Sequence, residues 1–112
     1  MEKSDVVAAI AGLAHGHQLD VFRLLVQGGA RGLSAGEIGV RLDLPLPTLA
    51  SALVRLEEAG LVTFRSDGVS VVYAANHDLM NDVLSYLLAN CQAATDPFEA
   101  EKVSLELAKK RL

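Results

Sequence analysis

Residues 33–64 decide the fold of this chain, and they read LSAGEIGVRLDLPLPTLASALVRLEEAGLVTF. Ser34 is followed by Glu37 three residues later, which is the pattern of a capping box at the start of a helix. The apolar spacing after it predicts a short helix that runs through Leu42. The stretch therefore opens with a short helix and a tight connection.

A second helix is expected directly after this connection, from Pro47 to Ala59. Proline suits the first turn of a helix, whereas Leu46 precedes a proline and is expected to be extended. Gly60 provides the stop. The predicted buried side consists of Leu49, Leu53 and Leu56.

The hydrophobic period changes to two after Gly60, which indicates strands. Residues 62–66 and 69–73 are the two predicted strands. Between them lies Asp67-Gly68, a strong signal for a two-residue hairpin turn. The helix pair is therefore followed by a β-hairpin.

Helices are also predicted on both sides of this segment. Residues 6–14 and 17–27 carry apolar side chains at helical spacing, and Leu79 to Cys91 is apolar around more than half of its circumference. A last helix begins at the cap Asp96-Pro97. The inward residues are expected to be Val6, Val7, Ile10, Leu13 and Ala14 in the first helix, and Leu19, Phe22, Leu25 and Val26 in the second.

This order of elements is typical of a winged helix-turn-helix protein, and the chain resembles the ArsR-type (arsenic-repressor-like) regulators. Four stretches carry the resemblance: residues 12–25, residues 33–38, residues 47–62 with their Glu-Ala-Gly-Leu-Val exit, and Asn90-Cys91. The resemblance implies a mainly α fold with a β-hairpin wing. It also implies a homodimer through the first and penultimate helices.

The resemblance implies a single winged-helix domain over residues 1–112, with dimerisation helices in 1–14 and 77–112. The helix-turn-helix is expected in 34–59 and the wing in 62–74. The implied function is sequence-specific binding to an inverted-repeat DNA operator as a transcriptional regulator, a repressor released by a small inducer of unknown identity. No cofactor is expected.

The candidate DNA contacts are Pro47, Thr48, Ser51, Arg55 and Arg65. Helical spacing places Thr48, Ser51 and Arg55 on one outward face, which also includes Ala52. An arginine there can pair with guanine or with phosphate, and hydroxyl groups can bond either base or phosphate. The alternative interpretation is a solvated helix face and a plain hairpin.

Charge argues for a second function. Residues 23–73 contain five basic and five acidic side chains, so the expected DNA-facing half is neutral. Ala50, Ala52 and Val54 stand where the family's recognition helix usually has polar or basic residues. The alternative function is therefore a winged-helix protein-interaction module that has weakened or lost DNA binding.

Cys91 is the only cysteine in the chain, and it is both a ligand or redox candidate and a candidate packing residue. His15 and His17 point apart on a helix and His77 has no second ligand pair, so we expect structural roles for these histidines and no metal site.

Length, charge and composition exclude other classes of protein. The 112 residues carry a net charge of −4 and are 51% hydrophobic. A single cysteine excludes an intramolecular disulfide framework, and no apolar run approaches the roughly 20 residues of a membrane span. No motif of nucleophilic, metal or nucleotide chemistry occurs. We expect a cytoplasmic protein that is not an enzyme and has no membrane partner.

Overall fold

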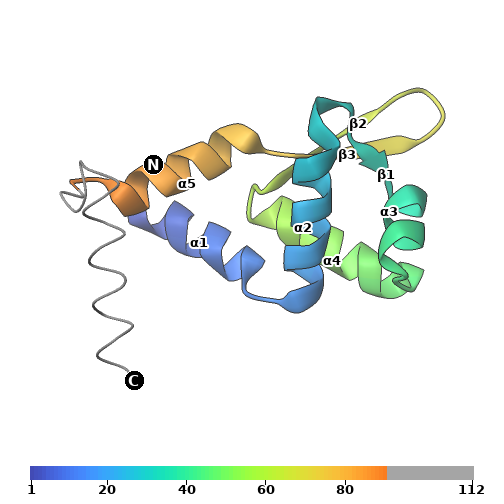
Figure 1. Ribbon diagram of the computed structural model, residues 1–112, viewed down its shortest axis with the longest axis horizontal. Helices are drawn as coiled ribbons and strands as arrows, with labels where there is room; N and C mark the ends of the chain where they lie inside the picture. Colours follow the sequence, from blue (N-terminus) through green and yellow to red (C-terminus); the bar gives the residue numbers. More distant parts are fainter. Residues whose placement is uncertain (91–112) are drawn as a thin grey trace, which may run out of the picture.

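A computed structural model describes residues 1–90 of the chain. Its elements are α1 (Lys3–Leu13), α2 (Gly16–Gly28), the short 3-10 helix η1 (Gly29–Arg31), β1 (Leu33–Ser34), α3 (Ala35–Leu42), α4 (Leu46–Glu58), β2 (Val62–Ser66), β3 (Val71–Ala75) and α5 (His77–Leu88). α2, α3 and α4 form a helical body next to the sheet, whereas α1 and α5 run side by side and project from this body (Figure 1). Cys91 and the predicted last helix lie outside the described residues.

α1 and α2 have different buried faces from those predicted. Val7 and Ile10 of α1 are exposed, as are Leu19 and Val26 of α2. On α2 the difference lies at Gln18, which is buried and whose Nε2 donates to the carbonyl oxygen of Gly12 over 2.6 Å. A buried amide that bonds the end of α1 rotates the inward face of α2. The buried residues are Val6, Ala9 and Gly12 in α1, and Gln18, Val21, Phe22 and Leu25 in α2.

The capping box of α3 is confirmed. The Ser34 Oγ accepts from the Glu37 amide over 3.2 Å, and the Glu37 Oε1 accepts from the Ser34 amide over 3.3 Å. α3 ends at Asp43, which takes a left-handed conformation with a φ of 52°. This turn leads the chain directly into α4.

α4 begins one residue earlier than predicted. Leu46 is helical, and the extended residue before the helix is Pro45, with a ψ of 145°. Pro47 is therefore the second residue of the helix. The first four amides of a helix have no intrahelical partner, so a proline there loses no hydrogen bond. The stop at Gly60 is confirmed, since its φ of +77° is one that glycine favours.

The wing is a three-stranded antiparallel sheet in the order β1-β3-β2. The predicted two-residue turn is wrong, because Ser66 pairs with Val71 and residues 67–70 form the loop. The Asp67 Oδ1 accepts from the amides of Val69 and Ser70 over 3.1 and 2.8 Å, and these bonds hold a longer loop. The pairing of β1 with β3 was not predicted, because β1 has only two residues.

α5 begins at His77, two residues earlier than the sequence pattern predicts. Asn76 explains this start, because its Oδ1 accepts from the Leu79 amide over 3.1 Å. The Nδ2 of the same side chain donates to the carbonyl oxygen of Gly60 over 2.9 Å. Asn76 thus ties the start of α5 to the end of α4.

Candidate nucleic-acid interface

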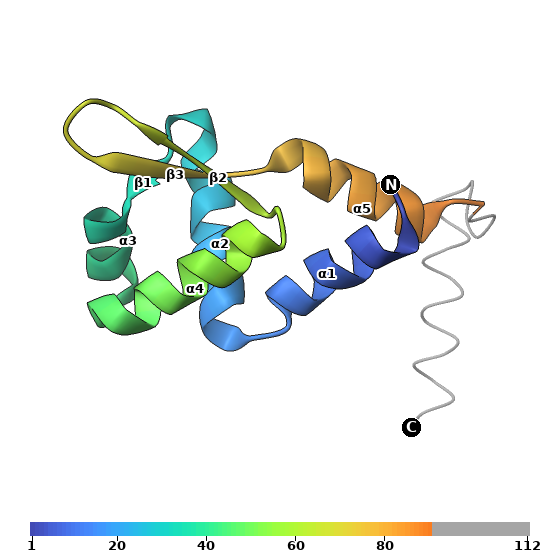
Figure 2. The same ribbon diagram turned by 180° about the vertical axis from the view of Figure 1, so that it is seen from behind.

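α4 presents one buried and one exposed side. Leu49, Leu53 and Leu56 are buried, as predicted. Ala52 is only 4% exposed, so the prediction that it lies on the outward face is wrong. α2 packs against α4, and the two helices cross in the helical body (Figure 2).

The sequence candidates on α4 differ in how far they are exposed. Pro47, Ser51 and Arg55 are exposed, and Thr48 is half-buried. Ser51 and Arg55 are four residues apart and therefore lie one turn above each other. Of the polar candidates on this helix, these two are the exposed ones.

An open groove runs along one flank of α4. Thr48, Ser51 and Arg55 line it from α4, and Gly12 lines it from α1. His15 and His17, at the start of α2, border the same groove. The groove therefore brings together three segments that are far apart in the sequence.

Arg65 holds the wing to the helical body. Its Nη1 donates to the carbonyl oxygen of Ala30 over 3.3 Å and its Nη2 donates to that of Arg31 over 2.9 Å. A guanidinium group has five N–H donors, so donors remain for a further acceptor. Arg65 is exposed and lies on β2 before the loop.

The loop of the wing carries a carboxylate. The amides of Ser70 and Val69 donate to Asp67 and lower the pKa of its carboxyl group below 3.8. Asp67 is therefore ionised at neutral pH. A negative charge at this end of the wing opposes contact with phosphate.

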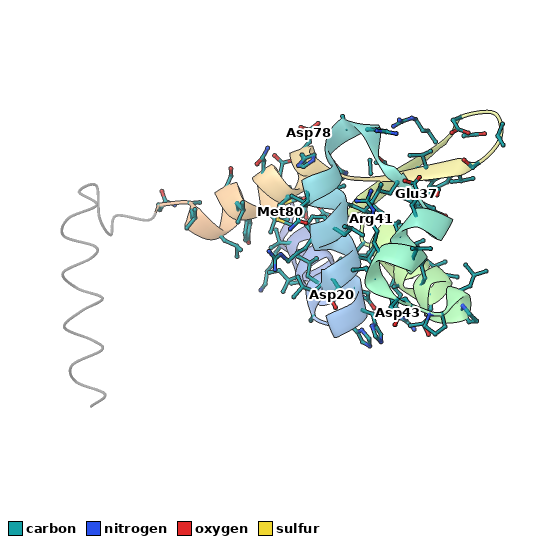
Figure 3. The ribbon with its side chains drawn as sticks, turned by 45° about the vertical axis from the view of Figure 1, so that its right-hand side comes forward. Asp20, Glu37, Arg41, Asp43, Asp78 and Met80 are labelled. Carbon is teal, nitrogen blue, oxygen red and sulfur yellow. The ribbon has the colours of Figure 1, made fainter. Side chains whose placement is uncertain are left out.

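Both signs of charge also occur beside the helix-turn-helix. Glu37, Arg41 and Asp43 lie on and directly after α3 (Figure 3). Glu58, close to the end of α4, borders the groove that Arg55 lines. The surface around α4 is thus mixed in charge and not uniformly basic.

The histidines have local roles. The Nδ1 of His15 accepts from the His17 amide over 3.3 Å and caps α2, as expected. The two rings lie 5.6 Å apart. His77 is the first residue of α5. Among residues 1–90, no group of three or more His, Cys, Asp or Glu is arranged to hold a metal ion.

α1 and α5 share an exposed apolar surface, which we call the α1–α5 face. Val83 of α5 packs into the core and Leu79 and Met80 pack partly against it, whereas the leucines further along the helix are exposed. Large apolar side chains are rarely left open to water over a continuous area unless a partner covers them. The exposed members are Val7, Ile10, Leu84, Leu87 and Leu88.

This geometry is similar to that of known protein families and solved structures. A family model described as a helix-turn-helix domain matches residues 13–64. An ArsR-like transcriptional regulator from Rhodococcus sp. RHA1 superposes with a TM-score of 0.68 at 20% identity, covering 96% of this chain and 86% of the other. The chain therefore has the winged helix-turn-helix fold of ArsR-type regulators.

Two further solved structures are similar to this chain. One is the homodimeric winged helix-turn-helix DNA-binding domain of a possible ArsR-family regulator from Mycobacterium bovis, with a TM-score of 0.63, 24% identity, and coverage of 76% of this chain and 77% of the other. The transcriptional repressor BigR from Xylella fastidiosa has a TM-score of 0.60 and 25% identity, over 80% of this chain and 90% of the other. A sequence comparison with curated proteins gives no match.

These similarities test several predictions that were made from the sequence. The predicted family resemblance and the mainly helical winged fold are confirmed. The similar structures are described as transcriptional regulators and as a repressor, which agrees with the prediction that this chain is not an enzyme. No helix within the described part of the chain is both long and apolar enough to cross a membrane.

Proposed function

We propose that this chain is an ArsR-type regulator that binds an inverted-repeat DNA operator as a two-fold dimer. The observation that carries the proposal is the exposed side of α4, where Ser51 and Arg55 stand in a helix-turn-helix next to a wing. In such units the second helix enters the major groove and the wing approaches the backbone. The boundaries expected for these parts are 34–59 for the helix-turn-helix and 62–74 for the wing.

Each candidate contact has a role in this proposal. Arg55 pairs with a guanine edge or with phosphate, and Ser51 bonds a base or phosphate. Pro47 and Thr48 approach the backbone at the start of α4. Arg65 keeps its two bonds to the carbonyl oxygens of η1 and uses its remaining donors on a phosphate.

The dimer forms through the α1–α5 face in this proposal. A second copy is the simplest cover for this surface, and the similar domain from Mycobacterium bovis is homodimeric. A two-fold dimer carries two copies of α4. It therefore favours an inverted repeat with half-sites about one helical turn apart.

Repression with release by a small inducer is the regulatory mode that we infer. It is supported by the similarity to the repressor BigR. An inducer acts by binding one arrangement of the two α4 helices better than the other, which shifts the population of DNA-competent dimers. A reporter gene behind the operator would be silenced by a repressor and stimulated by an activator.

Arg55→Ala tests the DNA contact. If Arg55 is bidentate to guanine, binding to the operator weakens by roughly 1–3 kcal/mol, with less loss on DNA that lacks this guanine. If Arg55 contacts phosphate, the protein loses affinity for all DNA sequences alike. The slope of the logarithm of the binding constant against the logarithm of the salt concentration then falls in magnitude by about one. Fluorescence anisotropy at several salt concentrations measures both quantities.

Arg23→Ala is the matched control for this experiment, because it removes the same charge from α2, outside both grooves along α4. It should leave sequence preference unchanged. Equal affinities of Arg55→Ala and the wild-type protein for every DNA tested would contradict the contact.

A second candidate function is a protein-interaction module. The observation that favours it is the mixed charge around α4, since phosphate neutralisation supplies most non-specific DNA affinity. Such a module would show no salt-sensitive binding to any DNA at low ionic strength. The anisotropy experiment therefore separates the two functions.

A further inference from the structure

α4 carries a row of exposed hydrocarbon side chains, which we call the apolar row: Leu46, Ala50 and Val54. They are four residues apart, so they follow one another along the same side of the helix. Val54 is 53% exposed although it lies in the middle of a well-packed element. Nothing within residues 1–90 covers this row.

The position of the row is set by the buried side of the helix. Each residue turns the helix by about 100°, so Val54 lies nearly opposite the stripe formed by Leu49, Leu53 and Leu56. Ser51 shares this outermost surface, while Arg55 lies toward the flank that faces α1 and α2. Ala50 and Val54 line a second, smaller groove, which shares Ser51, Arg55 and Glu58 with the first.

The chemistry of the row limits what it can recognise on DNA. A hydrocarbon side chain offers no hydrogen bond to a base edge. The only apolar group that a base presents in the major groove is the C5 methyl group of thymine. An exposed alanine and an exposed valine on an inserted helix therefore match thymine and no other base.

We propose that Ala50 and Val54 recognise thymine methyl groups, so that the operator half-site contains thymine at the positions that face them. This inference rests on the proposed function, because it assigns what the same helix reads in the major groove. A protein partner is the competing occupant. Ser51, Arg55 and Glu58 border the row on the groove side and leave little continuous apolar area for a protein interface.

The test begins with the full chain and a random DNA library, from which bound sequences are selected. Each thymine of the selected half-site is then replaced by uracil, which removes only the methyl group. One or two of these replacements should weaken binding by about fourfold each, the factor that corresponds to burial of one methyl group.

The matched protein variants are Val54→Ala and Val40→Ala. Val54→Ala should lose the penalty for uracil at one position and keep it at the others, which a double-mutant cycle measures as coupling. Val40 is 83% exposed on α3 and does not line the groove with the row, so Val40→Ala should keep every uracil penalty. Circular dichroism verifies that both variants fold.

Three results overturn the proposal. Selected DNA that binds equally well with uracil at every position shows that α4 does not read methyl groups, while the proposed DNA function stands. A uracil penalty that persists unchanged in Val54→Ala assigns the methyl contact to another residue. Failure to select any sequence would contradict the DNA function itself, and the inference about Ala50 and Val54 would fall with it.

Discussion

Single residues decide how closely the elements of this protein approach one another. Gly12 is buried where α1 crosses the end of α4, and an added Cβ would lie 2.9 Å from the Cβ of Ala59 and 2.9 Å from a methyl group of Leu61. Gly12→Ala gains about 1 kcal/mol of helix propensity but brings an overpacking cost of roughly 1–3 kcal/mol. We expect a lower melting temperature, measured by thermal unfolding.

Gly16→Ala is the control, because it makes the same substitution at another glycine. No atom outside its immediate neighbours lies within 4 Å of a Cβ added at Gly16, so this variant should be as stable as the wild-type protein or more so. If Gly12→Ala melts at the temperature of Gly16→Ala or above it, the close contact does not limit packing.

The wing shows how an element depends on one carboxylate. Asp67 accepts from the amides of Ser70 and Val69, and these bonds lower its pKa below 3.8. A group whose pKa is lowered by folding stabilises the fold above its unfolded pKa and loses this contribution as the pH falls through the folded pKa. The loop should therefore loosen in acid, below pH 3.8.

NMR titration measures this effect through the amide shifts of Val69 and Ser70. These shifts should follow the protonation of Asp67, with a midpoint below 3.8. Asp67→Asn keeps a side-chain oxygen as acceptor and should hold the loop without this pH dependence. A midpoint at or above 3.8 in the wild-type protein would contradict the role of the two amides.

For the whole molecule, the question is what covers the α1–α5 face. Leu87 is 55% exposed in the single chain, so a charge at this position costs the protomer little. In a dimer the same charge would be buried without a partner, which is expensive. Leu87→Glu should therefore give a folded monomer, with weaker binding to an inverted repeat.

Sedimentation at micromolar concentration measures the state of assembly. Val69→Glu is the control, because Val69 is 99% exposed in the wing loop and lies outside the α1–α5 face. This variant should remain a dimer. A wild-type protein that sediments as a monomer would contradict the dimer, and so would a Leu87→Glu variant that remains dimeric.

Local signals in the sequence were sufficient for most elements. The capping box at Ser34, the leucine stripe of α4 and the stop at Gly60 each act within a few residues, so their effects can be predicted from spacing and propensity alone. The alternation after Gly60 predicted a hairpin for the same reason. The order of these elements was enough to indicate a winged helix-turn-helix.

Contacts between distant residues decided the rest. The buried face of α2 depends on the bond from Gln18 to Gly12, and the start of α5 depends on the bond from Asn76 to Gly60. Spacing alone allowed Ala52 to lie on the exposed face with Ser51 and Arg55, but in the packed fold Ala52 is buried and Val54 is exposed. Periodicity predicts that a helix has two sides, whereas the neighbours that the fold brings to it decide which residues each side contains.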